Sequence, residues 1–202
     1  MKKLALLFAI LLGTMFSSVA QEGFNVRAGY KIPVDNITEN PDIHGFNIGV
    51  NKDFKITENF YFRPGLYYLL KWSNYKVNEY YLDAYKLDYP NVNVTKDSRF
   101  KCNSNLLEIP LMAAWKKGNF DFEVGPYVSF ALASKNTLAG EKISSKYGYK
   151  KFDVGFKGSF GYNILEKYYI GISYENGIKN LSCDKHGKSF TQNLSFNLGY
   201  NF

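Results

Sequence analysis

Strict alternation of apolar and polar residues is the feature that most constrains the fold of this chain. The last ten residues, NLSFNLGYNF, place an apolar side chain at every second position, namely at Leu194, Phe196, Leu198, Tyr200 and Phe202. Successive side chains of a strand point to opposite faces, so this segment has one apolar face and one polar face. In a soluble sandwich the apolar face would form the core, whereas in an outer-membrane barrel it would face lipid.

The same alternation recurs in seven earlier segments, so the sequence predicts eight strands. These segments begin at Phe24, Phe46, Phe60, Leu107, Phe120, Phe152 and Tyr168. Nine charges inside them all fall on the polar parity: Arg27, Arg63, Lys71, Glu108, Asp121, Glu123, Asp153, Lys157 and Glu175. The strands approach the roughly 9 to 11 residues of a tilted membrane strand, and such long regular strands are rare in a sandwich. We therefore predict an all-β fold, an eight-stranded antiparallel up-and-down transmembrane β-barrel.

The connections between the predicted strands alternate in length. Short ones lie near residues 55–59, 116–119 and 163–167, and long polar ones span residues 33–43, 73–104, 133–149 and 176–191. Short periplasmic turns and long extracellular loops are typical of outer-membrane barrels. Pro64, Pro110 and Pro126 fall within predicted strands of a barrel that has no free edge, so we expect a bulge or a rim position near each of them.

The N-terminal segment has the pattern of a secretory signal peptide. Lys2 and Lys3 precede an apolar run that ends in the small residues before Gln21. A membrane-anchoring helix is the alternative, but the run is shorter than the roughly 20 residues needed to span. We predict a cleaved signal peptide over residues 1–20, a barrel domain over residues 21–202, and a location in the bacterial outer membrane. Cleavage would remove two lysines and lower the net charge from +7 to +5. The remaining lysines and arginines do not form the clustered basic stripe that nucleic-acid binding requires.

The interior of an eight-stranded barrel is just wide enough to be filled by side chains. Opposite charges in this lumen should therefore pair, since an unpaired buried charge is costly. We expect Arg27 and Arg63 to meet Asp121 and Glu123, and Lys71 and Lys157 to meet Glu108, Asp153 or Glu175. The glycines of the polar face should make room for these long side chains. The alternative interpretation of the same charges is the selectivity lining of a small-solute pore.

The sequence offers little for catalysis or metal binding. His44 and His186 have no recognisable serine motif beside them. Cys183, Asp184 and His186 lie close together in the sequence, but no second group of metal-ligating residues is spaced to complete a metal site with them. No glycine-rich segment opens a helix, so a phosphate loop is absent. We predict a protein that is not an enzyme and needs no cofactor or metal, with a barrel-embedded lipid-modifying enzyme as a further alternative. Cys102 and Cys183 can form one disulfide in an exported protein.

The second long loop is the candidate for binding a partner. It exceeds the roughly 12 to 15 residues beyond which a structureless loop is usually functional or disordered. Tyrosines mixed with small polar residues make adaptable binding surfaces. The alternative is that the strands extend past the membrane and the tyrosines cover one another. The tyrosines in question are Tyr75, Tyr80, Tyr81, Tyr85 and Tyr89.

Several segments resemble the PorT-like outer-membrane β-barrel proteins, which are small barrels of the OmpA/OmpX type that are sometimes labelled porins. The matching residues are LEIPL at 107–111, GPY at 125–127, Asp153 with Gly155, and Tyr174 with Gly177 and Ile178. An aromatic carboxyl terminus completes the pattern. The resemblance implies an eight-stranded barrel of the outer membrane. The family takes its name from a member linked to protease secretion, and the motif residues imply no catalytic role.

The sequence thus predicts a non-enzymatic outer-membrane barrel with a packed, charged lumen. Its extracellular loops are expected to act in partner binding, as a secretion accessory or in envelope structure. The partners expected are outer-membrane lipid, an unidentified protein or glycan at the loops, and the barrel assembly machinery, for which the terminal Phe202 resembles a recognition signal.

Overall fold

The computed structural model describes residues 23–34, 43–77, 79–143, 152–179 and 192–202. The chain forms eight long strands: β1 (Phe24–Pro33), β2 (Ile43–Lys52), β4 (Phe60–Lys76), β5 (Arg99–Lys117), β6 (Phe120–Leu138), β8 (Phe152–Ile164), β9 (Tyr168–Gly177) and β10 (Gln192–Asn201). Four short elements join them: β3 (Phe54–Lys55), η1 (Glu79–Tyr81), α2 (Leu82–Asp88) and β7 (Glu141–Ile143). The predicted signal peptide, residues 1–20, lies outside the described residues.

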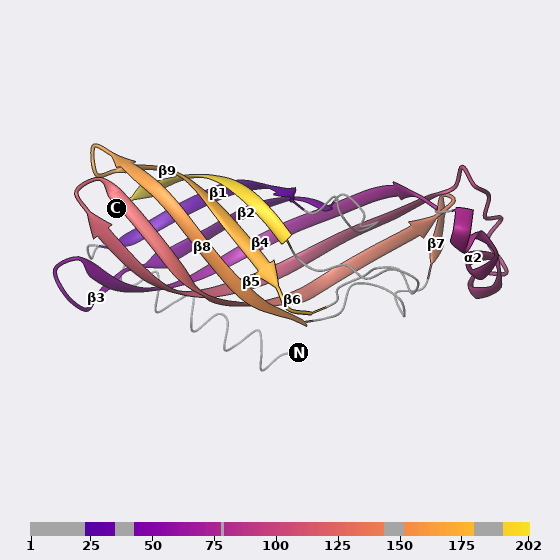
Figure 1. Cartoon of the computed structure of the whole chain (residues 1–202), viewed down its shortest axis with the longest axis horizontal. Helices are drawn as coiled ribbons and strands as arrows, with labels where there is room; N and C mark the ends of the chain where they lie inside the picture. The colour runs from indigo at the N-terminus through magenta and orange to yellow at the C-terminus, as the bar shows by residue number, and fades with distance from the viewer. Residues whose placement is uncertain (1–22, 35–42, 78, 144–151, 180–191) are drawn as a thin grey trace.

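The eight long strands close into one antiparallel barrel. They pair in the order β2-β1-β10-β9-β8-β6-β5-β4, and β4 pairs back to β2. The first and last strands meet with Ala28 opposite Leu198, and the backbone N–H of Phe202 donates to the carbonyl of Phe24 at 2.8 Å. Figure 1 shows the tilted strands of this barrel. The predicted fold is confirmed, since closure satisfies every edge that an open sheet would expose to lipid.

The barrel is apolar outside and polar inside. Phe156, Phe196 and Leu198 are more than half exposed, whereas the side chains of Arg63 and Lys31 are almost completely buried. A soluble protein would bury the first set and expose the second. The outward face therefore contacts lipid, and the charged face fills the lumen.

We expected a bulge or a rim position near each of the three prolines, and the ladders show no register shift at any of them. The β4–β5 ladder lacks paired residues at Gly65 and Leu66, opposite Pro110, but keeps the same register on both sides. The β6–β8 ladder runs through Pro126 without a break. The register shift of the β5–β6 ladder lies instead at Asn105/Leu106, where Leu132 of β6 is skipped. A missing N–H therefore opens the ladder locally, and the bulge forms where β6 leaves the barrel.

Three neighbouring strands continue far beyond the barrel. β4, β5 and β6 have 17, 19 and 19 residues, whereas β1, β2, β9 and β10 have 10 each. Figure 1 shows them running out to β7 and α2, on the side away from the short turns. We call the outward ends of β4 to β6, with β7, η1 and α2, the extension. Outer-membrane barrels typically have short periplasmic turns and long outer loops, so this pattern predicts that the extension lies outside the cell.

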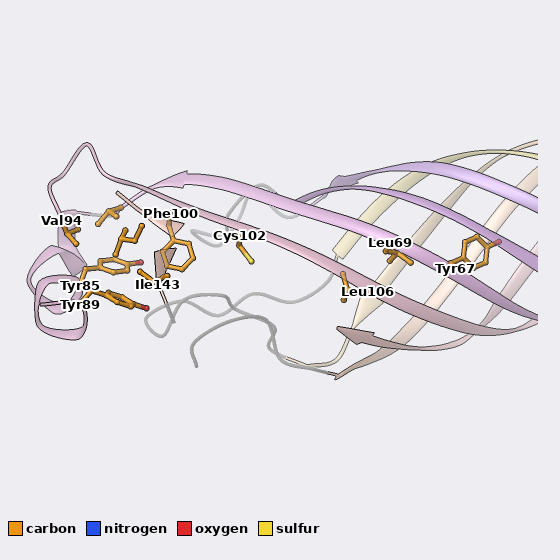
Figure 2. Packing of buried hydrophobic residues seen from close by; sticks show 11 residues of the cluster. Tyr67, Leu69, Tyr85, Tyr89, Val94, Phe100, Cys102, Leu106 and Ile143 are labelled. Atoms are coloured by element: carbon orange, nitrogen blue, oxygen red, sulfur yellow. The ribbon is translucent and has the colours of Figure 1, made fainter. Parts of the chain in front are cut away.

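The extension has a hydrophobic core of its own. Phe100 and Leu138 lie opposite each other on β5 and β6 and are completely buried, and Ile143 of β7 packs in the same cluster. Tyr85 of α2 and Tyr89 stack on each other with ring centroids 6.5 Å apart. Figure 2 shows Tyr85, Tyr89, Phe100 and Ile143 gathered at the tip. Leu69 and Leu106 lie further along toward the barrel. A core of this kind holds the loop as a fixed structure on the sheet.

Candidate functional site

Two clusters of charged side chains fill the lumen, and the one nearer the short turns is organised around Arg63. The guanidinium of Arg63 contacts the carboxylates of Asp53, Asp121 and Glu123. Arg27 contacts two of these three carboxylates. Its Nη1 lies 2.5 Å from Glu123 and its Nη2 lies 3.6 Å from Asp121. We call these residues and Lys116, which lies 2.6 Å from Asp53, the inner cluster. Its three cations and three carboxylates leave no net charge.

The second group, the outer cluster, joins three lysines to two glutamates. Lys31 lies 2.5 Å from Glu175 and 3.3 Å from Glu108. Lys157 lies 2.8 Å from Glu108 and Lys71 lies 3.9 Å from Glu175. All five side chains are at least nine-tenths buried. Such burial is tolerable because each charge has an opposite partner within contact distance.

The structure thus brings Arg27 and Arg63 to Asp121 and Glu123, and Lys71 and Lys157 to glutamates. Asp153 instead accepts a hydrogen bond from the Tyr127 hydroxyl at 3.2 Å. Sequence reasoning left three members of these clusters unassigned: Lys31, Asp53 and Lys116. Lys31 shares the parity of Arg27 and was recoverable from the alternation, whereas Asp53 lies in a turn and Lys116 at a strand end, where parity gives no signal.

The glycines of the lumen make room mainly for rings and amides rather than for charged chains. Gly161 and Gly171 lie opposite each other on β8 and β9, and a Cβ on either would lie within 2.5 Å of the Tyr169 ring or hydroxyl. This ring in turn lies 3.7 Å from the guanidinium carbon of Arg27. Gly199 lies against the charged chain of Arg27, and Gly45 lies against those of Lys71 and Lys31.

A small cavity lies in the lumen beside the inner cluster. Its volume is about 20 Å³, and its lining includes Arg27, Tyr67, Glu123, Lys157 and Tyr169. That is space for roughly one water molecule. Toward the extension, the apolar side chains of Leu69 and Leu106 are completely buried within the strands. Side chains therefore occupy the lumen around this cavity and at the level of Leu69 and Leu106.

The candidate binding tyrosines divide into separate groups. Tyr85 and Tyr89 are only 2% and 8% exposed, so they lie in the core of the extension and not on its surface. They cover one another, which was the alternative interpretation of this segment. Tyr80 is 85% exposed and Leu87 of α2 is 82% exposed, so these side chains are available at the tip. The side chains of Tyr75 and Tyr81 lie outside the description.

The remaining candidates have structural surroundings. His44 stacks with Tyr30 and Trp72 on the outward face, and its Nδ1 lies 3.1 Å from the Tyr30 hydroxyl. Aromatic groups of this kind belong at a membrane interface. Cys102 of β5 is buried in the hydrophobic cluster that includes Phe100 and Leu138. Cys183, Asp184 and His186 lie outside the described residues, so the disulfide remains a prediction. Among the described residues no group of His, Cys, Asp and Glu could hold a metal ion.

The sequence of this chain matches the family model of the outer membrane protein beta-barrel domain over residues 10–182. The chain belongs to this family. Its location is therefore the outer membrane, where the apolar face described above contacts lipid. Within the described residues no helix is long and apolar enough to cross a membrane.

Solved structures similar to this chain are also outer-membrane barrels. The attachment invasion locus protein Ail of Yersinia pestis is 13% identical, with 90% of this chain and 100% of that chain covered and a TM-score of 0.40. The N-terminal β-barrel domain of Pseudomonas aeruginosa OprF is 11% identical, with 90% and 98% covered and a TM-score of 0.41. Neisserial surface protein A is 14% identical, with 89% and 97% covered and a TM-score of 0.44. No curated protein matches the chain.

Proposed function

We propose that this protein is a non-enzymatic barrel that holds a rigid platform outside the outer membrane for a protein or glycan partner, as a secretion accessory or an element of envelope structure. The observation that carries the proposal is the extension. Three strands run beyond the barrel, and a buried core fixes the loop on them. A rigid support lowers the entropy lost when a surface binds its partner. Loops without such a function are rarely this elaborate.

The proposed contact surface is the tip of the extension, where Tyr80 and Leu87 are exposed. Contiguous exposed apolar patches mark interaction sites, and we propose that these two side chains contribute to one. Tyrosine also contributes a large contact area at low conformational cost. The buried Tyr85 beneath them keeps α2 in place rather than meeting the partner.

The placement among PorT-like proteins, the cleavage of residues 1–20 and recognition of the terminal Phe202 by the barrel assembly machinery belong to the same proposal. Phe202 is 59% exposed, and its ring lies 4.9 Å from that of Tyr200. This exposed aromatic pair at the end of the closing strand supports a recognition role. A pairing of Cys102 with Cys183 would further tie the last loop to β5.

Photo-crosslinking in intact cells tests the proposed contact surface. A photoreactive amino acid at Tyr80 should capture one dominant protein or glycan, because this side chain projects from the tip. The same capture should fall strongly when Leu87 is changed to Lys, since a charge would interrupt the apolar contact. The readout is the mass and identity of the adduct.

A photoreactive amino acid at Leu165 is the matched control. Leu165 is 78% exposed, but it lies in the short turn between β8 and β9, at the opposite end of the barrel. Capture of the same species from both positions, or no capture above background from Tyr80, would contradict the platform proposal.

The small-solute pore is the competing function, and conductance separates the two. The purified barrel in a planar bilayer should show no discrete conductance steps, because the cavity beside the inner cluster has space for about one water molecule and buried charged side chains surround it. Steps that disappear when Lys157 is changed to Met would favour the pore. Unfolded protein must first be excluded by the heat-dependent shift in electrophoretic mobility that folded barrels show.

A further inference from the structure

The outward face of the extension is a continuation of the lipid-facing surface of the barrel. On β4 the outward positions run from Leu70 and Trp72 to Asn74 and Lys76 without a change of parity. On β5 they run from Leu107 to Lys101 and Arg99 in the same way. The side chains of this face therefore project over the bilayer beside the barrel, rather than over its mouth.

The outward side chains change from apolar to basic at the cross-strand row that contains Trp72. Trp72, Asn103 and Lys135 lie in one cross-strand row. The next row outward places Lys101 beside Thr137, which also pairs with Lys142 of β7. The row after that pairs Lys76 directly with Arg99. We call the five exposed cations of these rows the basic face: Lys76, Arg99, Lys101, Lys135 and Lys142.

The basic face carries an excess of positive charge. Asp97 lies 3.7 Å from Lys76, and both side chains are largely exposed. Glu141 neighbours Lys142, but it has the opposite parity and pairs with the buried Leu138. Like charges placed directly across two strands, as Lys76 and Arg99 are, destabilise a sheet. Asp97 offsets one of the five charges of the basic face, and a further anion beside the other four would offset the remaining repulsion.

The position of the basic face along the strands, just beyond the aromatic cluster, indicates which anion it meets. Trp72, Tyr30 and His44 form a ring cluster on the outward face, as aromatic residues do at a membrane interface. Lys135 lies level with Trp72, and Lys76 is four residues further along the strand, which is about 13 Å. Phosphates of lipid headgroups occupy this zone, and flexible lysine and arginine chains reach them readily.

We propose that the basic face binds the phosphate groups of outer-leaflet lipid headgroups, and so fixes the extension against the membrane surface. This site lies on the outward face of the sheet, separate from the tip that carries Tyr80. The lipid-binding proposal is therefore independent of the partner proposed above. Headgroup binding would orient the tip by holding one face of the platform to the lipid.

Lipid selectivity of the reconstituted full chain tests this site. The association of a spin-labelled phosphatidic acid is compared with that of a spin-labelled phosphatidylcholine by electron paramagnetic resonance. The unaltered protein should prefer the phosphatidic acid. Changing both Lys101 and Lys135 to Gln should lower this preference by about fivefold for each charge removed.

The matched control changes Lys86 and Lys96 to Gln, which removes the same charge from exposed lysines of the loop that carries α2. This variant should keep the full preference. An equal loss of the phosphatidic acid preference in both variants would overturn the proposal, because the preference would then depend only on the net charge of the protein. An unchanged preference in the Lys101 and Lys135 variant would also overturn it, as would tight binding of free inositol hexakisphosphate in neutral micelles without any lipid preference. Heat-dependent electrophoretic mobility confirms that each variant is folded.

Discussion

Changing Arg63 to Ala should lower the free energy of unfolding by about 3–5 kcal/mol. The guanidinium is completely buried and contacts three carboxylates, those of Asp53, Asp121 and Glu123. Its removal leaves these carboxylates close together with only Arg27 and Lys116 to balance them. The expected result is a lower unfolding temperature, measured by the loss of the fast-migrating folded form on electrophoresis after stepwise heating in detergent.

The control for this prediction is Arg99→Ala. Arg99 is an exposed residue of the extension, and its removal changes the net charge by the same amount without opening the inner cluster. Its unfolding temperature should stay close to that of the unaltered protein. If Arg63→Ala unfolded at the same temperature as Arg99→Ala, the inner cluster would not contribute to stability.

Changing Gly161 to Val should prevent the barrel from closing. The first atom of the new side chain would lie 2.2 Å from the Tyr169 ring, which also packs against the guanidinium of Arg27. A ring in this position cannot move aside as a flexible chain end would, and overpacking of this kind forces the backbone to shift. The expected result is a near-complete loss of folded protein after refolding into detergent, measured by electrophoretic mobility and circular dichroism.

Gly158→Val on the same strand is the matched control. A Cβ at Gly158 would have its nearest neighbour 3.8 Å away, so this variant should refold normally. Combining Gly161→Val with Tyr169→Ala should restore much of the folded yield, because the second change vacates the occupied space. Normal refolding of the single Gly161 variant would show that the lumen is looser than these contacts require.

The alternation was sufficient to predict the barrel because a strand's two faces meet two different solvents. Lipid on one side and a packed polar lumen on the other leave no freedom for a charge such as Glu175 or Lys157 to change parity. The same logic located Lys71 and Glu108 in the lumen. It gave no information on Asp53, which reaches the inner cluster from a turn, where no periodicity exists. The prolines misled for a related reason, since the sequence cannot show that Gly65 and Leu66 absorb the missing hydrogen bonds without a shift in register.

The sequence by itself determined the number of strands, the face of each that meets lipid, and the residues available for the lumen. Each of these follows from local parity. Only the tertiary structure decided that Arg63 is the centre of the inner cluster, that Tyr169 occupies the space left by a pair of glycines, and that Tyr85 and Tyr89 form a core rather than a binding surface. These depend on which strands become neighbours and on how far β4 to β6 continue beyond the barrel. Alternation is the same for a strand in the membrane and for its extension above it, so the sequence pattern cannot separate the two.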